Sequence, residues 1–562
     1  MTLEEVRLVP APRRVVAGQD VLRVKRAFSV RSVEGLPWGC EGFPGRLEAA
    51  LGSAGLKVKF FEVDQYEEQA YKIEIGRGGV IVCARNVRGL WYGAQTLRQL
   101  LAQAGAEIPC GVIEDTPRFG WRCVYLDLRV HKYKTAYLKQ VCAELGRLKY
   151  SAVLLNYHDT FAFKKEPCVR GDIYISAEHI AELNKAAREA GIELIPYQAV
   201  LGAVEQLVEL ERYRGMRTAD GTLDVGNAQA VRVMCGLLDE LMAAHDAAVI
   251  GLGVPAPHEA GEELSEAAMA YLDALVAHVE KRGKTPLVCV GGGAGMAGWL
   301  ERMPKNTIVA YTAHDEGGLG QLTSACARNG LRMAGVVHGR AAHDNELCSD
   351  RRAAVAQVHA GVAALGRAEV TRAVVALPSG CACVQGARPA LSALCGGRLM
   401  HVALQWPVLA AAADALWSAT PDAARVEAAW PRYWWGLDDT RVNELADVCA
   451  ADPLRVKHTA EIIKRGKRIS KLAAELKPAR HAEQLGLYDF YARLAVHAVH
   501  VRQTFARTPR LPQVNLLMNE LARLKDLHKD VMSETMYRRE IVEEQAHLFG
   551  HTEMLLGRIK GA

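Results

Sequence analysis

The sequence predicts an α/β protein built on a (β/α)8 TIM barrel, preceded by a small α/β accessory domain and followed by a helical C-terminal region. Between Arg122 and Leu377, eight short runs rich in Val, Ile and Leu alternate with stretches of helical periodicity. Fully buried parallel strands have this composition, and eight strand–helix units make a (β/α)8 barrel. Strand-like runs stop beyond residue 420. A doubly wound sheet would give the same alternation and stays an alternative.

Residues 1–118 form the predicted accessory domain. YKIEI (Tyr71 to Ile75) and GVIVCA (Gly79 to Ala84) are alternating apolar runs with a glycine turn between them, which predicts a hairpin. GLWYGAQTLRQLL (Gly89 to Leu101) has apolar residues at helical spacing. It therefore predicts a helix that covers one face of a sheet. Pro117 marks the boundary that follows.

Residues 119–420 form the predicted barrel. Each of its eight strand-like runs is short, apolar and bounded by polar residues or glycine. In chain order the runs are CVYLDL, SAVLLNY, IELIPYQA, AAVIGLG, PLVCVGG, TIVAYTA, MAGVVHG and RAVVALP.

Residues 421–562 form the predicted helical C-terminal domain. A tryptophan-rich stretch leads into long amphipathic helices, in which Leu517, Leu521, Leu524 and Val531 recur on one face. This spacing is typical of a helical bundle packed against the barrel. A homo-oligomer formed through these helices is the alternative.

The composition argues against several classes of partner. The net charge of +5 is small and spread along the chain, so we expect neither nucleic acid nor a membrane as a partner. No apolar run reaches the roughly 18 residues of a membrane helix, and MTLEEVRLVPAPRR lacks the apolar core of a secretory signal. The 14 cysteines are scattered, and Cys381 and Cys383 lack a second Cys/His pair. We therefore expect a cytoplasmic protein without a metal or cofactor.

Several longer stretches are similar to known enzymes. YKIEI, GLWYGAQTLRQLL and then IPCGVIEDTPRFGWRCVYLDLR, with Asp115, Pro117, Phe119 and Arg122 in the spacing D-x-P-x-F-x-x-R, resemble glycoside hydrolase family 20 β-N-acetylhexosaminidases. LLNYHDTFAF resembles the second barrel strand of the hexosaminidase D branch of that family. The likeness spans most of residues 60–310. It implies the accessory domain, the barrel and an N-acetylhexosamine-type carbohydrate as ligand.

The same resemblance implies that the catalytic acids of the family are missing. Family members carry an Asp–Glu pair after the fourth barrel strand, where this chain has Gly253 and Val254. The Gly-His pair of the third-strand loop is replaced by Gly202 and Ala203, and a W-D-D-M run by Gly293 to Met296. In the family's mechanism the Asp orients the substrate's acetamido group and the Glu protonates the leaving oxygen. Glycine and valine can do neither.

Other polar residues follow the predicted strands, where barrel enzymes place their sites. His314, Asp315 and Glu316 come after the sixth strand. Asp315 and Glu316 are candidate substitutes for the missing acid and base, and a solvated loop explains the same residues. Candidate sugar contacts, each with a structural alternative, are Arg129, His158, Asp159, His314 and Trp406. For Arg129 the resemblance implies a contact with sugar hydroxyls, and for Trp406 the alternative is core packing.

One motif indicates another class of function. Gly293, Gly295 and Gly298 satisfy G-x-G-x-x-G after the fifth strand-like run, and Asp315 follows about 20 residues later. A dinucleotide or phosphate site would have this spacing, although such a motif normally opens a two-half nucleotide domain. The sequence thus favours a catalytically impaired β-N-acetylhexosaminidase homologue (a pseudoenzyme) that binds carbohydrate or a partner. An active glycosidase with a relocated acid and a repurposed nucleotide-binding barrel are the alternatives.

Overall fold

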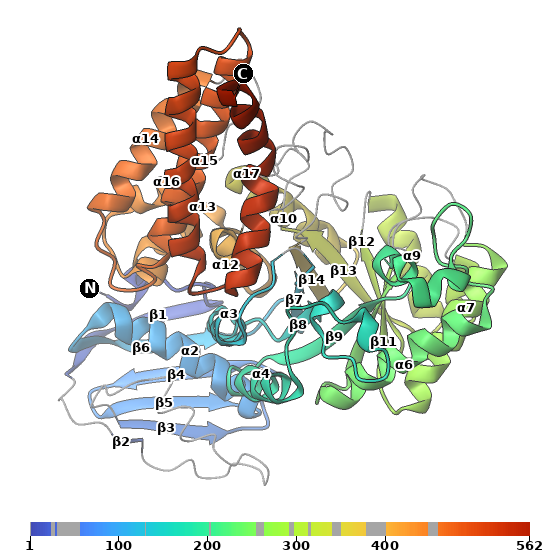
Figure 1. Ribbon diagram of the computed structural model, residues 1–562. Coiled ribbons are helices and arrows are strands. Elements are labelled where there is room, and N and C mark those ends of the chain that lie inside the picture. Colours follow the sequence, from blue (N-terminus) through green and yellow to red (C-terminus); the bar gives the residue numbers. More distant parts are fainter. Residues whose placement is uncertain are drawn as a thin grey trace.

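A six-stranded sheet, a closed barrel and a group of long helices make up the molecule (Figure 1). The computed structural model describes residues 2–23, 29–30, 57–129, 131–201, 204–254, 264–290, 297–312, 316–339, 350–377, 401–447 and 459–561. The sheet lies beside the barrel, and the C-terminal helices rise from the junction of the two. The predicted fold class is confirmed, and the doubly wound alternative is excluded by the closed barrel.

The sheet of the accessory domain has the strand order β1-β6-β4-β5-β3-β2. The predicted hairpin is confirmed, because β4 and β5 pair antiparallel with Gly76 opposite Gly79. The predicted helix is α2, and it begins after Asn86, whose side chain accepts a hydrogen bond from the Gly89 N–H. A Cβ on Gly93 would lie 2.7 Å from Val82 Cγ1, so this glycine lets the helix approach the sheet closely. The elements are β1 Arg14–Arg23, β2 Ser29–Val30, β3 Lys57–Glu62, β4 Tyr71–Gly76, β5 Gly79–Ala84, α2 Val87–Ala104 and β6 Glu107–Asp115.

All eight predicted runs are strands of one closed parallel barrel. Apolar residues fill its interior, as expected of a packed barrel core. The strands are β7 Trp121–Asp127, β8 Ala152–Asn156, β9 Glu193–Ala199, β10 Val249–Val254, β11 Thr285–Val290, β12 Ile308–Thr312, β13 Arg332–His338 and β14 Arg372–Leu377.

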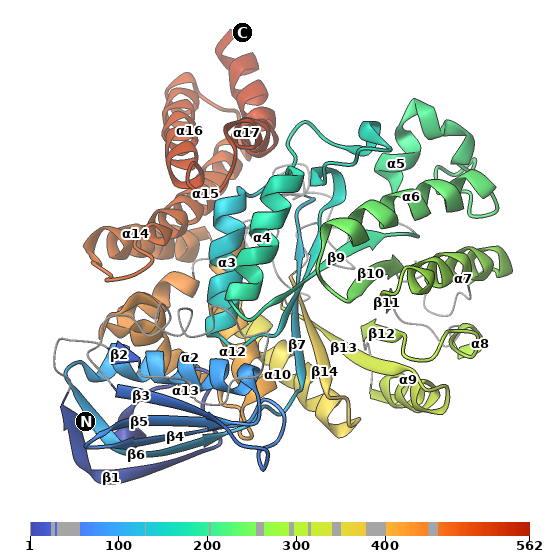
Figure 2. The ribbon, with the colours of Figure 1, turned by 90° about the horizontal axis from the view of Figure 1, so that it is seen from below.

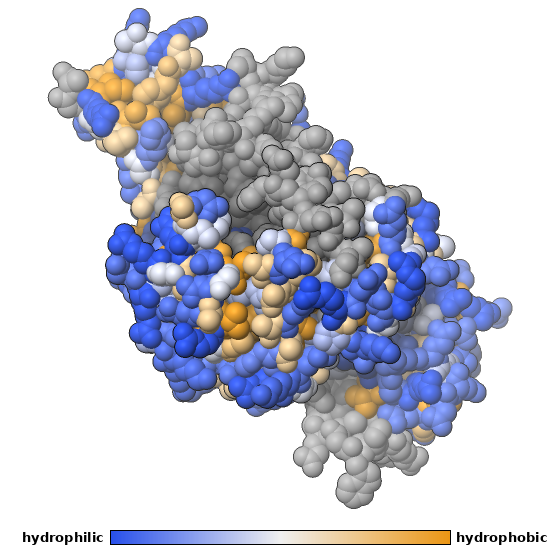
Figure 3. Space-filling model, turned by 90° about the vertical axis from the view of Figure 1, so that its right-hand side faces the viewer, coloured by the Kyte–Doolittle hydropathy of each residue, from blue (hydrophilic) through white to orange (hydrophobic). Residues whose placement is uncertain are grey.

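Helices surround the barrel strands (Figure 2). They pack their apolar faces on the outward side chains of the strands, which builds the largest hydrophobic core of the molecule. On the face in Figure 3, hydrophilic residues lie to both sides of a band of apolar ones and below it. The helices are α3 Thr135–Arg147, α4 Ala177–Glu189, α5 Glu205–Glu209, α6 Ala228–Ala244, α7 Glu266–Lys281, α8 Ala297–Leu300, α9 Glu316–Arg328, α10 Arg351–Arg367 and α12 Trp406–Trp417.

The C-terminal region is helical, as predicted. Leu517, Leu521 and Leu524 are buried along one face of α16, and Val531 is partly buried. None of the helices that the structure describes is both long and apolar enough to cross a lipid bilayer. The elements are α13 Ala423–Trp430, η8 Pro431–Trp435, η9 Thr440–Asp447, α14 Thr459–Glu475, α15 Gln484–Phe505, α16 Leu511–Met532 and α17 Arg538–Gly561.

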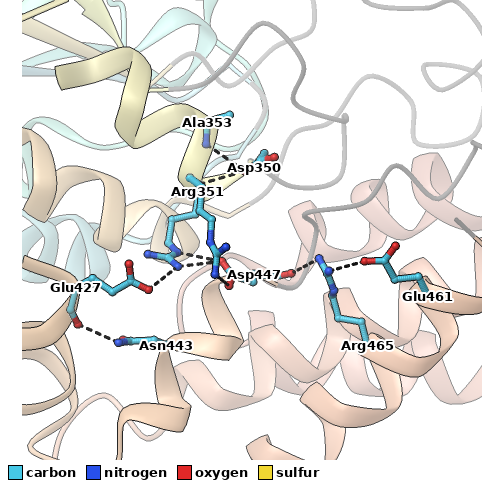
Figure 4. Close-up of polar contacts among 9 residues, drawn as sticks. Asp350, Arg351, Ala353, Glu427, Asn443, Asp447, Glu461 and Arg465 are labelled. Carbon is cyan, nitrogen blue, oxygen red and sulfur yellow. Dashed lines mark hydrogen bonds and ion pairs between the residues drawn. The ribbon is translucent and has the colours of Figure 1, made fainter. Parts of the chain in front are cut away.

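Arg351 at the start of α10 ties the barrel to this region (Figure 4). Its Nη2 lies 3.0 Å from Glu427 Oε1 on α13 and 3.0 Å from Asp447 Oδ1 at the end of η9. Arg352 Nη2 reaches the other oxygen of Asp447 at 3.2 Å. The Arg351 side chain is only 10% exposed, whereas the side chains of Arg352 and Glu427 reach solvent, so Arg351 is the buried centre of a network that bridges two chain regions.

Asp115 ties the accessory sheet to the base of the barrel. Its Oδ2 accepts hydrogen bonds from Tyr71 Oη at 2.5 Å, Trp417 Nε1 at 2.8 Å and Lys149 Nζ at 3.0 Å. Lys149 and Asp115 are each 1% exposed in their side chains. Buried Arg122 donates to the carbonyls of Lys149 and Phe119. Two residues of the D-x-P-x-F-x-x-R pattern therefore hold the two domains together.

Candidate functional site at the barrel mouth

The carboxyl ends of the eight parallel strands form one mouth of the barrel, where side chains alternate between the interior and the surrounding helices. Cys123 and Tyr125 belong to the interior, so Asp127, two residues further on, also faces the mouth. By the same alternation, Leu154 places Asn156 there, and Val336 places His338 there. His338 pairs with Ala376 of the last strand. These positions line the region where a barrel ligand would bind.

Arg129 is held in place by Asp127. Asp127 Oδ2 accepts from Arg129 Nη2 at 2.8 Å and from Nε at 3.2 Å, and its Oδ1 accepts from the Arg129 backbone N–H at 2.9 Å. The Asp127 carboxylate is fully buried, whereas the Arg129 side chain is 23% exposed. The guanidinium is thus preorganised at the rim and still reaches solvent.

Asn156 joins two of the strands at the mouth. Its Nδ2 donates to Tyr125 Oη at 3.2 Å and lies 3.4 Å from Asp127 Oδ1. Its Oδ1 accepts from the backbone N–H of His158. Burial, reinforced by the charge of Asp127, raises the pKa of Tyr125 well above its ordinary value. The phenol is therefore a neutral hydrogen-bonding group here.

His158 and Asp159 lie in a 3₁₀ turn directly after β8. Asp159 Oδ2 is 2.7 Å from Lys132 Nζ, and Asp159 Oδ1 is 3.5 Å from His158 Nδ1. Burial alone would raise the pKa of the Asp159 carboxyl, but the neighbouring His158 and the hydrogen bond from Lys132 hold it below its ordinary value. Asp159 is therefore an ionised carboxylate that forms an ion pair with Lys132. This contact is a structural role, and it leaves a role in ligand binding open as well.

Tyr197 of β9 occupies the space beside Gly253. A Cβ built on Gly253 would lie 1.9 Å from Tyr197 Oη and 2.5 Å from Tyr197 Cζ, and one on Gly251 would lie 2.9 Å from Tyr197 Cδ2. The ring also packs edge-on against Tyr125, with the ring centroids 5.2 Å apart. At position 253 the side-chain space that faces the barrel interior is filled by a phenol from the neighbouring strand.

Val254 faces the opposite way. It is 4% exposed and belongs to the core between the barrel and its helices, together with Ile250 and Leu252 of the same strand. The contacts of Gly251 and Gly253 with Leu154 and Tyr197 place the glycines on the interior side of β10. Of the two positions that the family resemblance assigns to the acids, only 253 faces the mouth.

Trp406 requires a correction. The sequence suggested it as a platform for sugar stacking, but it begins α12, is 2% exposed and packs against Trp434 with ring centroids 4.9 Å apart. A stacked sugar needs an accessible aromatic face. Trp406 is instead a core residue, which was the alternative interpretation of the sequence.

Several other candidates lie outside the described residues. His314 and Asp315 belong to this group, as does the side chain of Glu316, whose backbone begins α9. Gly202, Ala203 and Gly293 to Met296 also lie outside the described residues. Within the described ranges, no three His, Cys, Asp or Glu side chains gather in an arrangement that could hold a metal ion.

Four residues of the site were not singled out from the sequence: Tyr125, Lys132, Asn156 and Tyr197. Tyr125 and Asn156 share the strand alternation of Asp127, so counting in twos along each run would have found them. Tyr197 follows the interior residue Ile195 in the same way along β9. Lys132 carries no such signal, because it lies outside the strands and its partner Asp159 comes from another segment of the chain.

Comparison with known proteins agrees with this architecture. Residues 5–116 match the family model described as glycosyl hydrolase family 20, domain 2. A β-hexosaminidase of Akkermansia muciniphila is 34% identical over 101 residues, which cover 17% of this chain and 20% of that protein. A lacto-N-biosidase of Bifidobacterium bifidum is 24% identical over 206 residues, covering 34% and 18%. The chain thus matches about a fifth of the length of these curated relatives.

Solved structures extend the likeness over the barrel. The β-N-acetylhexosaminidase of Streptomyces coelicolor superposes with a TM-score of 0.60 at 20% identity, covering 77% of this chain and 97% of that one. A Flavobacterium johnsoniae chitobiase superposes with a TM-score of 0.58 at 18% identity, covering 98% and 100%. At this level of identity the superpositions establish the fold.

Proposed function

We propose that this chain, a glycoside hydrolase family 20 β-N-acetylhexosaminidase-like protein, binds an N-acetylhexosamine-type sugar at the barrel mouth and is catalytically impaired toward β-N-acetylhexosaminides. The observation that carries this proposal is the position of Tyr197 over Gly253. A missing acid would leave space that a neighbouring carboxylate could enter. Here the space is filled by a phenol.

The chemistry of the family requires two carboxyl groups on this strand end. One orients the acetamido group whose oxygen attacks the anomeric carbon, and the other protonates the leaving oxygen. Gly253 supplies no functional group, and the hydrocarbon side chain of Val254 packs away from the mouth. Loss of a general acid alone costs about 10²–10⁴-fold in rate. Loss of the orienting carboxylate adds to that cost.

The groups that remain at the mouth suit binding of hydroxyls and amides. The guanidinium of Arg129, oriented by Asp127, presents donors at the rim. Asn156 and the phenols of Tyr125 and Tyr197 can exchange hydrogen bonds with sugar hydroxyls, and the two rings offer apolar surface. Such a site can hold a sugar without supplying an acid to cleave it.

Binding to Arg129 tests the location of the site. Titration calorimetry with N-acetylglucosamine should show saturable binding to the wild type and a weaker affinity for Arg129→Ala. Loss of one charge-assisted hydrogen bond costs about 1.5–3 kcal/mol, or roughly 10- to 150-fold in affinity. Arg23→Ala is the matched control, since Arg23 is an exposed arginine on β1 of the accessory sheet. Equal affinities for the wild type and Arg129→Ala would contradict the proposed site.

A relocated acid is the competing explanation. Asp159 is poorly suited to this role, because a carboxyl whose pKa lies below its ordinary value is ionised and cannot donate a proton near neutral pH. Asp315 and Glu316 are the other candidates, and their removal is the test. The nucleotide alternative is disfavoured, because the G-x-G-x-x-G motif normally opens a doubly wound domain, whereas here it follows β11 of a closed barrel.

A further inference from the structure

A small cavity lies where three parts of the chain meet. It is lined by α2 of the accessory domain, by α3 of the barrel, and by η8 with the segment before α15. Figures 1 and 2 show α2 on the sheet and α3 on the barrel, near the start of the helical region. The cavity volume is about 50 Å³. A water molecule needs roughly 10–15 Å³ on this measure, so the cavity has room for several waters or one compact group.

The charges around this cavity are unbalanced. Arg98, Arg147 and Arg480 line it, and the carboxylate among its lining residues is Glu144. Glu144 pairs with Arg147. Arg480 Nη2 donates to the backbone carbonyl of Arg432 at 2.5 Å. Among the ion pairs of the described ranges, none includes Arg98 or Arg480, and Glu144, which is paired with Arg147, acts on both guanidinium groups only at longer range.

Partial burial of Arg98 makes this imbalance costly. It lowers the pKa of Arg98 to about 10, with a further contribution from the charge of Arg147. Desolvation also lowers the pKa of Arg480, and the charge of Arg147 lowers it further. Arg98 is partly buried, whereas Arg480 is exposed beside it, so the cost of removing an unpaired charge from water falls mainly on Arg98. An anion between the two guanidinium groups would relieve that cost.

Further hydrogen-bond donors at the cavity also lack a partner. The hydroxyl of Tyr433 and the Nε–H of Arg147 are buried, and neither has a hydrogen-bond partner among the described residues. Both residues line the cavity. Buried polar groups in folded proteins are nearly always paired, so each such group calls for an explanation. One oxyanion with several acceptor oxygens would satisfy both donors and balance the charges of Arg98 and Arg480.

We propose that this cavity between the three domains binds a phosphate-type oxyanion, either as free inorganic phosphate or as the phosphate group of a small molecule. Guanidinium groups match the geometry of phosphate oxygens and bind them through paired N–H donors. Because the ligating groups come from all three parts of the chain, the bound anion also holds these parts together. This site is separate from the barrel mouth and does not depend on the proposed sugar binding.

Thermal unfolding tests the proposal directly. Millimolar inorganic phosphate should raise the Tm of the wild type above its value in sodium chloride of equal ionic strength. Arg98→Gln and Arg480→Gln should lose this phosphate-dependent rise. Without phosphate their Tm should equal or exceed that of the wild type, because a repulsive charge is gone. Arg188→Gln is the control: Arg188 is an exposed arginine on α4 that pairs with Asp246, and this variant should keep the full phosphate response.

The two sources of phosphate are distinguished by a second probe. A larger Tm rise with a hexose phosphate than with inorganic phosphate would indicate the phosphate group of a small molecule. An equal or smaller rise would indicate the free anion. A rise that persists in Arg98→Gln and Arg480→Gln would overturn the site. If these variants do not fold, equilibrium dialysis of labelled phosphate with the wild type tests the site instead. Absence of saturable binding at millimolar phosphate would overturn the proposal.

Discussion

The phenol oxygen of Tyr197 lies where the side chain of residue 253 would begin, 1.9 Å from the Cβ that a non-glycine residue would place there. Real Cβ atoms do not approach other heavy atoms so closely. A residue with a Cβ at position 253 and the Tyr197 ring in its present position therefore cannot occur together. A large side chain at 197 in this orientation requires glycine at 253. An acidic side chain at position 253 is therefore incompatible with this orientation of the Tyr197 ring.

Substitutions at these two positions should be strongly coupled. Gly253→Asp alone should destabilise the fold by at least the ~1–3 kcal/mol typical of overpacking, because the new side chain meets the Tyr197 ring. Tyr197→Ala removes the obstacle, so Gly253→Asp should cost much less in that background. Urea unfolding of the four proteins gives the coupling free energy, and additive effects would show that the ring does not occupy this space.

Asp115 should be one of the most sensitive positions in the molecule. Asp115→Ala leaves the ammonium of Lys149 buried without its carboxylate, which costs about 3–5 kcal/mol. Glu182→Ala is the control, because it breaks a surface pair with Lys139 on neighbouring helices and should cost no more than ~1 kcal/mol. Chemical denaturation measures both. A similar small loss for the two variants would contradict the role of Asp115 in joining the domains.

Asp159 should contribute stability that depends on pH. Its pKa in the folded protein lies below its ordinary value of 3.8, so the folded state favours the ionised carboxylate. The stabilisation is therefore complete above pH 3.8 and is lost as the pH falls through the folded pKa. The difference in urea midpoint between the wild type and Asp159→Asn should shrink in that acidic range. A difference that does not vary with pH would contradict the ion pair with Lys132.

His245 should stay neutral well below its ordinary pKa. It is buried, with Nε2 2.8 Å from Tyr157 Oη and Nδ1 2.8 Å from the carbonyl oxygen of Leu241, and burial lowers its pKa to about 4. Since the folded pKa is depressed, the protein should lose stability as the pH falls from 6.5 toward 4, by an amount on the order of 3 kcal/mol. Its imidazole NMR signals should not titrate between pH 5 and 8. A midpoint near 6.5 would contradict the buried environment.

The fold could be predicted from the sequence more fully than the site. Each apolar run from CVYLDL to RAVVALP is a barrel strand, because runs buried on both faces are short, β-branched and bounded by polar residues. The contact between Tyr197 and Gly253 could not be predicted in this way. It depends on the register of β9 against β10, where Gly251 pairs with Tyr197 and Gly253 with Ala199, and on the rotamer of one ring.

Trp406 is a residue whose role the sequence alone predicted wrongly. Its place after the eighth strand suggested the mouth, but α12 packs it into the core beside Trp434. Large aromatic residues look the same in a sequence whether they bind a sugar or fill a core. The charge imbalance around Arg98 was also invisible in the sequence, because its neighbours Arg147 and Arg480 lie far away along the chain.

Release of chromophore from an aryl N-acetyl-β-glucosaminide is the most direct test of catalytic impairment. The wild type should be compared with buffer and with a variant carrying both Asp315→Asn and Glu316→Gln. We expect turnover by both proteins to equal the buffer rate, since the position that faces the mouth is Gly253 beneath the Tyr197 ring. Turnover by the wild type that disappears in the double variant would contradict the proposal and assign the acid to the loop after β12.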